Sequence, residues 1–168
     1  ITPPTYEYIA NGLQYAKDKQ LDFVILELDT PGGLYQTTRE IGQLILSSPV
    51  PVITYVSPQG ARAASAGTFI LYASHLTAMA PGTHLGSASP ISISPQAEAP
   101  ETTSQAKIIN DTLAYIRSLA QYHNRDVEFG LDAVNDAASI TAQEALDKGV
   151  IEIISPDIDD MLKQADNM

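Results

Sequence analysis

Two nearly continuous apolar runs, residues 23–28 and 51–56, constrain the fold of this 168-residue chain more than any other feature. Runs of this length and composition are typical of parallel strands that are covered on both faces. A helix-like pattern lies between them, in which Ile41, Leu44 and Ile45 share one face. Because strands and helices alternate along the chain, we expect one α/β domain over residues 1–168 with a mostly parallel sheet.

The remaining pattern predicts further elements of the same kind. Helices are expected over residues 5–17, 68–72 and from Lys107 onward, and strands over residues 76–80 and 150–154. In the first of these helices, Tyr8, Ile9, Leu13 and Ala16 recur on one side. Thr141 and Glu144 have the spacing of a capping box at a helix start. Residues from about 90 to 106 are rich in Ser, Pro, Glu, Thr and Ala, which predicts a flexible flap.

Charge excludes several classes of partner. The formal net charge is −11, with nine Lys and Arg residues against 20 Asp and Glu residues. Nucleic acid needs clustered basic residues, and an anionic membrane surface repels such a chain, so neither is expected to bind. There is no cysteine, which removes disulfides, thiolate catalysis and cysteine metal sites. We expect no cofactor and no metal.

No apolar stretch approaches the roughly 18–20 residues of a membrane-spanning helix. The chain also begins at Ile1 and has no signal-peptide pattern. We therefore expect a processed or excised domain that is soluble as given, with any anchor outside it.

Two short motifs together suggest acyl transfer. The first motif, residues 28–33, lies at the end of the first apolar run and closes with Gly32 and Gly33. The second motif, residues 63–67, contains Ser65 between alanines at the start of a helical run. Backbone N–H groups at Gly32 or Gly33 and at Ala66 could hold an oxyanion, because a helix N-terminus leaves its amides free and glycine leaves room for substrate. Either motif alone is better explained as an ordinary turn or a helix N-cap, but the two together favour function.

A serine nucleophile needs a base. The histidines, His75, His84 and His123, lack an obvious orienting carboxylate and are better explained as surface or packing residues. Among the lysines, only Lys107 stands at a helix start, after a flap and before an apolar face. Both the helix dipole and desolvation would favour its neutral amine there. An ordinary solvated lysine explains the same position, so position alone leaves the base undecided.

The two motifs, residues 78–83 and the ending over residues 144–151 closely resemble the ClpP/crotonase superfamily. Within it, the chain is most similar to the N-terminal protease domain of NfeD-type membrane-bound serine proteases, the stomatin-operon partner proteases. The resemblance extends from about Thr5 to the end. It implies a ClpP/crotonase-like spiral of ββα units, a Ser–Lys dyad of Ser65 and Lys107, and an oxyanion hole at Gly32, Gly33 and Ala66.

The resemblance also implies a function, a location and partners. It implies an endopeptidase for apolar peptide segments, with a stomatin-like membrane protein as a candidate substrate. It further implies a homodimer or higher homo-oligomer, in an extracytoplasmic domain tethered by membrane helices outside this chain. ClpP places its histidine a few residues past Pro81-Gly82, where this chain has Gly86-Ser87-Ala88, and this difference favours lysine as the base.

Two departures from the family pattern stand out. Arg62 lies beside the serine motif, where the family usually has a small residue, so local charge or specificity is expected to differ. The usual first strand, ahead of the first helix, is largely missing from this chain.

Two other functions are compatible with such a fold. A crotonase-like acyl-CoA enzyme would share the oxyanion geometry, but it needs acids near the thioester and basic groups for the CoA phosphates. An inactive peptide-binding or assembly module would keep the fold without cleavage. Ser65 and Lys107 both argue against this second alternative.

Overall fold

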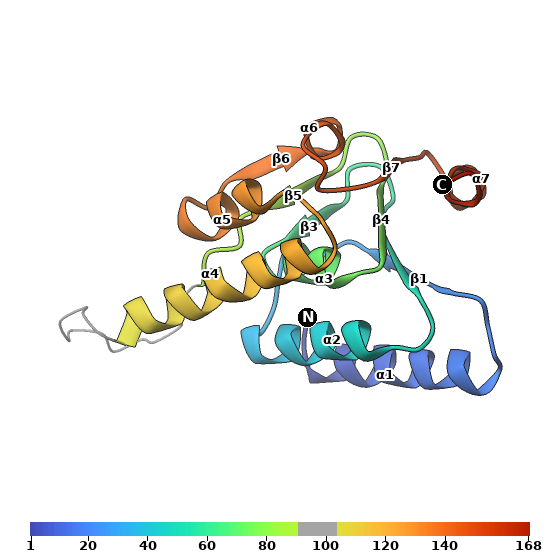
Figure 1. The fold of residues 1–168 in the computed structure, drawn as a ribbon, viewed down its shortest axis with the longest axis horizontal. Helices are drawn as coiled ribbons and strands as arrows, with labels where there is room; N and C mark the ends of the chain where they lie inside the picture. The colour runs from blue at the N-terminus through green and yellow to red at the C-terminus, as the bar shows by residue number, and fades with distance from the viewer. Residues whose placement is uncertain (91–103) are drawn as a thin grey trace.

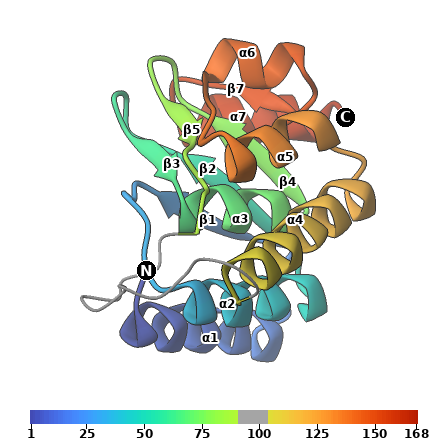
Figure 2. The ribbon, with the colours of Figure 1, turned by 90° about the vertical axis from the view of Figure 1, so that its left-hand side faces the viewer.

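The computed structural model describes residues 1–90 and 104–168, so most of the expected flap lies outside the described residues. The described chain forms two small sheets surrounded by helices (Figures 1 and 2). The helices are α1 (Pro3–Asp18), α2 (Tyr35–Ser47), α3 (Ala66–Ala73), α4 (Ser104–Tyr122), α5 (Val127–Asn135), α6 (Ala142–Asp147) and α7 (Ile158–Asp166). The strands are β1 (Val24–Leu28), β2 (Val52–Val56), β3 (Arg62–Ala64), β4 (Leu76–Met79), β5 (His84–Gly86), β6 (Ser139–Thr141) and β7 (Ile153–Ile154).

The larger sheet has the order β1-β2-β4-β7 and is parallel throughout. Val24 pairs with Val52 and Leu28 with Val56, so the two apolar runs seen in the sequence lie side by side. The smaller sheet has the order β3-β5-β6, with β3 parallel and β6 antiparallel to β5. The α/β class with a mostly parallel sheet is confirmed.

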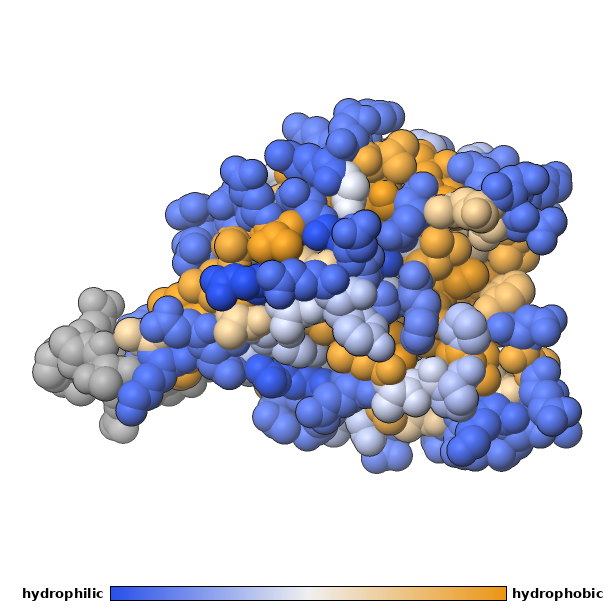
Figure 3. Space-filling model, viewed as in Figure 1, coloured by the Kyte–Doolittle hydropathy of each residue, from blue (hydrophilic) through white to orange (hydrophobic). Residues whose placement is uncertain are grey.

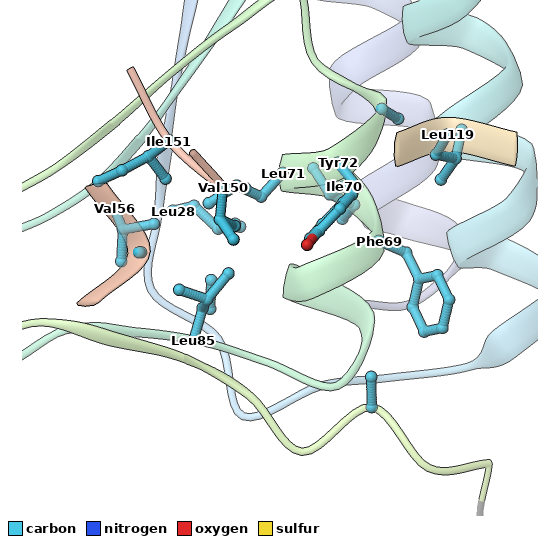
Figure 4. Close-up of a cluster of buried hydrophobic side chains, with 14 of the residues drawn as sticks. Leu28, Val56, Phe69, Ile70, Leu71, Tyr72, Leu85, Leu119, Val150 and Ile151 are labelled. Atoms are coloured by element: carbon cyan, nitrogen blue, oxygen red, sulfur yellow. The ribbon is translucent and has the colours of Figure 1, made fainter. Parts of the chain in front are cut away.

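The main core lies between the larger sheet and the helices α2, α3 and α4. Figure 4 shows its apolar side chains converging from strands, helices and the segment before β7. Helix α3 is buried at every residue, which is why its sequence is apolar all round. On the other side of this sheet, Met161 of α7 packs against Ile53, Tyr55 and Ile153. Figure 3 shows apolar residues between α7 and the α1–α2 pair, on an otherwise largely polar face.

Several expected features differ in the structure. Helix α4 begins at Ser104 instead of Lys107, and α7 was not expected from the sequence. The short strands β3 and β5 were not expected at all, because three residues carry too little pattern to be recognised. Tyr8 is 78% exposed, whereas Ile9, Leu13 and Ala16 are buried as expected. The capping box of Thr141 and Glu144 is formed.

One buried cation joins three segments of the fold. The Arg125 side chain is only 1% exposed and lies 3.2 Å from the Glu152 carboxylate. It also donates to the carbonyl oxygens of Tyr72 and Ser74, which end α3. Glu152 in turn accepts two hydrogen bonds from Thr77 at the start of β4. This network fixes the end of α3 against β4 and the approach to β7.

The substitution Glu152→Gln should therefore destabilise the fold, because it leaves Arg125 buried without its counter-charge. We expect a loss of about 2 kcal/mol in the free energy of unfolding, below the usual cost of a fully buried pair because Glu152 is partly exposed. Urea denaturation measures it, with the exposed Glu7→Gln as the matched control. Equal stability of the two variants would contradict the structural assignment of this network.

Candidate active site

The two sequence motifs meet in the structure. The Thr30 N–H donates to the Arg62 carbonyl oxygen at 2.8 Å, and the Ala64 N–H donates to the Thr30 carbonyl oxygen at 3.1 Å. These bonds form an isolated parallel bridge between Thr30 and Ala63. The Arg62 N–H also donates to the Asp29 carboxylate. The glycine turn and the serine motif are therefore neighbours held by backbone pairing.

Ser65 stands at the N-cap of α3 in an uncommon backbone conformation, with φ of 52° and ψ of −111°. Its N–H donates to the Gly86 carbonyl oxygen of β5 at 2.8 Å. A positive φ at a residue with a side chain costs of order 1–3 kcal/mol and persists only where the surrounding structure enforces it. This conformation was not predicted from the sequence. It places Ser65 on a sharp turn between β3 and α3.

Gly32 lies directly against Ser65. A Cβ atom added to Gly32 would lie 2.9 Å from the Ser65 Cβ and 3.3 Å from its Oγ, closer than real Cβ contacts allow. Gly32 also has φ of 133°, which favours glycine. Gly67 also has no room for a side chain, because a Cβ there would lie 2.7 Å from the Thr30 side chain. Small residues in both motifs are thus needed for the two segments to approach.

The hydrogen bonds distinguish the two glycine amides. The Gly32 N–H donates to the Thr30 hydroxyl at 3.1 Å, so it is already used within its own turn. Among the described residues, the Gly33 N–H has no backbone acceptor. Ala66 is the first residue of α3, where an amide has no intrahelical acceptor. Among the described residues, the Gly33 and Ala66 amides therefore have no backbone acceptor, whereas the Gly32 amide is bonded to Thr30, and Gly33 packs closely against the backbone of Ile1.

Lys107 lies in the first turn of α4, and its side chain is exposed. Its burial by the described residues is thus too slight to supply the desolvation expected from the sequence. The contact that a dyad needs, a hydrogen bond between the Ser65 hydroxyl and the Lys107 amine, is not formed among the described residues. The dyad stays a prediction, and catalytic contacts in unliganded enzymes often tighten only with substrate.

The histidines have structural contacts. The His75 Nδ1 accepts from the Val52 N–H at 3.1 Å, and the His123 Nε2 lies 3.0 Å from the Ala73 carbonyl oxygen. His84 is exposed on β5. Burial lowers the pKa of His75 and of His123, and the Arg125 guanidinium lowers both pKa values further. These contacts agree with the packing interpretation of His75 and His123.

A hollow of about 860 Å³ reaches the glycine motif at Asp29. Its lining includes four carboxylates, those of Glu27, Asp29, Asp157 and Asp159, and none of the predicted site residues. Such a lining repels the phosphates of CoA.

Among the described residues, no group of three or more His, Asp and Glu side chains is placed to hold a metal ion. Arg62 is exposed on β3.

Comparison with known proteins identifies the family. The model of the NfeD1b N-terminal domain matches residues 2–165. The chain belongs to this family. It is 42% identical, over its whole length, to the membrane-bound protease PH1510 of Pyrococcus horikoshii, and 30% identical, over 94% of its length, to the membrane protein NfeD1b of Bacillus subtilis. It spans 38% and 37% of the lengths of these two curated relatives.

Solved structures agree with this assignment to the NfeD1b family. A serine-to-alanine mutant of the 1510-N membrane-bound stomatin-specific protease superposes with a TM-score of 0.92 at 41% identity, covering 100% of this chain and 81% of that one. A lysine-to-alanine mutant of the same protease, in complex with a substrate peptide, gives 0.91 at 42% identity, covering 100% and 76%. ClpP1 from Listeria monocytogenes gives 0.72 at 16% identity, covering 96% and 89%, and shows the ClpP-like fold alone.

These relatives include membrane-bound proteins, and no helix in the described part of this chain is long and apolar enough to cross a bilayer.

The Gly32–Ser65 approach leads to a test of the site's architecture. Gly32→Ala combines a positive φ with a steric clash against Ser65, whereas Gly60→Ala has a positive φ of 84° but open space around the new methyl group. We expect Gly60→Ala to cost about 1 kcal/mol of unfolding free energy and Gly32→Ala distinctly more. Chemical denaturation of both variants measures this difference, and equal costs would mean that Gly32 and Ser65 are not in close contact.

Two histidines with lowered pKa values, His75 and the half-buried His123, predict the pH dependence of stability. His75 and His123 have lower pKa values in the folded chain than in the unfolded chain, where the histidine pKa is about 6.5. The folded chain therefore binds protons at these residues more weakly, and their contribution to stability is full above pH 6.5. It is lost as the pH falls through the lowered folded pKa values.

The double variant His75→Gln/His123→Gln should therefore show a shallower decline of unfolding free energy between pH 7 and pH 5. The exposed His84→Gln should keep the original slope. A double variant with an unchanged slope would show that these two imidazoles do not carry the effect.

Proposed function

We propose that this chain is the protease domain of an NfeD-type serine endopeptidase that uses a Ser–Lys dyad. The observation that carries the proposal is Ser65 at positive φ on the N-terminus of α3, pressed against Gly32. A strained turn of this kind presents the hydroxyl outward, while the amides beside it stay free. The similarity to a stomatin-specific protease over the whole chain supports the same function.

In the proposed reaction, Ser65 attacks the scissile carbonyl carbon while the neutral amine of Lys107 takes the hydroxyl proton. Negative charge develops on the carbonyl oxygen, and the N–H groups of Gly33 and Ala66 hold it. The protonated lysine then gives its proton to the departing amine, and water hydrolyses the acyl-enzyme. We assign Gly32 to the packing of the turn, since its own amide is bonded to Thr30.

The exposure of Lys107 fits an enzyme that is completed by its substrate. A peptide lying across Gly33 and Ser65 would cover the first turn of α4 and remove water from the amine. That loss of water favours the neutral form that a general base requires. Leu34 and Ile108, adjacent in sequence to Gly33 and Lys107, are among the exposed large apolar residues, and they suit an apolar peptide.

The substrate, assembly and location are proposed by analogy. A related protease is described as stomatin-specific and was solved with a substrate peptide, so we propose an apolar segment of a stomatin-like membrane protein as the substrate. We also propose that the domain acts as a homodimer or higher oligomer. We further propose an extracytoplasmic position and an anchor formed by segments outside this chain, and the membrane-bound relatives support the anchor.

A fluorophosphonate probe tests the nucleophile. The chain should be labelled, Ser65→Ala should not be, and mass spectrometry should place the adduct on Ser65. Lys107→Ala should stay folded but lose cleavage of an apolar peptide by at least about 100-fold, the usual contribution of a general base. The exposed Lys148→Ala is the matched control and should cleave normally.

Other outcomes would select the alternatives. Peptide binding without labelling or cleavage would favour an inactive binding module. Turnover of a CoA thioester would favour a crotonase-like enzyme.

A further inference from the structure

A cluster of aromatic and charged side chains joins α2, which follows the glycine turn, to α3 and to the helix of Lys107, α4. It consists of Tyr35 and Arg39 on α2, Phe69 on α3, and Asp111 and Tyr115 on α4, and is called here the Arg39 cluster. Figure 2 shows the first turns of α4 beside α2, in the region where these residues lie.

Spacing in the sequence ties the cluster to the site. Tyr35 is two residues after Gly33, Phe69 is four residues after Ser65, and Asp111 is four residues after Lys107. Lys107 and Asp111 both lie within α4, where a separation of four residues is about one turn, so these two residues share a face. Any shift of α4 that moves Asp111 therefore moves Lys107 with it.

Arg39 is the centre of the polar contacts. Its Nη1 donates to the Asp111 carboxylate at 3.0 Å and to the Tyr35 hydroxyl at 3.2 Å. The Tyr35 hydroxyl also donates to Asp111, at 3.4 Å. These three side chains thus connect the helix that follows the glycine turn to the helix of Lys107.

Aromatic contacts lie beneath this polar triangle. The Arg39 guanidinium carbon is 4.2 Å from the centre of the Tyr115 ring, within the range of a cation–π contact. Phe69 stacks on Tyr115 at 5.9 Å and meets Tyr35 edge-on at 6.2 Å. Phe69 is 3% exposed, so the helix of Ser65 enters the cluster from the core.

The ion pair between Arg39 and Asp111 would by itself contribute little to the stability of the fold. The Arg39 and Asp111 side chains are 31% and 63% exposed, and pairs this accessible contribute about 0–1 kcal/mol. The ring contact differs, because Tyr115 is largely buried and burial raises its pKa to about 12, which keeps the phenol neutral. Gly42 makes room for it, since a Cβ there would collide with the Tyr115 hydroxyl. The cluster is therefore a specific connection between helices and more than a surface contact.

We propose that Arg39 is a positioning residue that holds the first turns of α4 on α2 and so places Lys107 relative to Ser65. This role rests on the proposed Ser–Lys function. Arg39 acts through Asp111 and Tyr115 and does not touch the reacting atoms. Because a displacement of about 1 Å can cost about 100-fold in rate, loss of Arg39 should slow catalysis much more than it destabilises the fold.

A double-mutant cycle tests this role. Rates of fluorophosphonate labelling and of peptide cleavage are measured for the original chain, Arg39→Ala, Lys107→Ala and the double variant. We expect Arg39→Ala to lower kcat about tenfold or more, with KM nearly unchanged. In the Lys107→Ala background the same substitution should have no further effect, because the group that Arg39 positions is already gone.

Matched variants exclude a general loss of structure. Asp111→Asn, at an exposed carboxylate, should remain folded and lose part of the rate, and Arg39→Lys should keep more rate than Arg39→Ala. Arg117→Ala removes the same charge from an exposed position farther along α4 and should cleave normally. Thermal melts of all variants accompany the rates.

The outcomes separate the two proposals. A normal rate in Arg39→Ala, or an equal loss in both backgrounds, would overturn the positioning role alone. An unchanged rate in Lys107→Ala would overturn the Ser–Lys function itself, and the positioning role with it.

Discussion

The backbone pairing of Thr30 with Ala63 is the constraint on which the site depends. Two hydrogen bonds hold the ends of β1 and β3 in register, and this register sets Gly32 against Ser65. Only residues without bulk tolerate that distance, which explains the glycines and alanines of both motifs. The positive φ of Ser65 is sustained because its N–H is anchored to Gly86 on one side and α3 begins on the other.

The residues of the proposed site differ in how firmly the surrounding structure holds them. Ser65 and Ala66 stand at the start of the fully buried helix α3, and Gly33 lies in the turn between β1 and α2. Lys107 stands on the exposed first turn of α4, and the Arg39 cluster is the contact described between that end of the helix and α2. In such an enzyme the nucleophile and the oxyanion hole are rigid, and the base comes from a more exposed element. The active site would then become complete when substrate covers the base.

Much of the fold could be predicted from the sequence, because long apolar runs and helical periodicity report burial directly. The parallel pairing of β1 with β2 and the capping box at Thr141 follow from such local patterns. The short strands β3 and β5 could not be predicted, since their pairing depends on partners far away in the chain. Tyr8 was placed on the buried face of α1 but is exposed, because it directly precedes Ile9 and lies outside the side of the helix that Ile9, Leu13 and Ala16 bury.

The catalytic roles of the site residues stay predictions, but the structure tests how the two motifs are placed. The proximity of the glycine turn to Ser65 was expected from the two motifs and is present in the structure. The distinction between the Gly32 and Gly33 amides needed the Thr30 hydroxyl bond, which no spacing reveals. The Arg39 cluster was missed because its members come from three helices and form no motif in the sequence.

A crystal structure of the phosphonylated chain would test the central claim most directly. The account predicts an adduct on the Ser65 Oγ whose phosphoryl oxygen accepts hydrogen bonds from the Gly33 and Ala66 N–H groups at about 2.7–3.1 Å. An adduct on another residue, or a phosphoryl oxygen turned away from both amides, would contradict it.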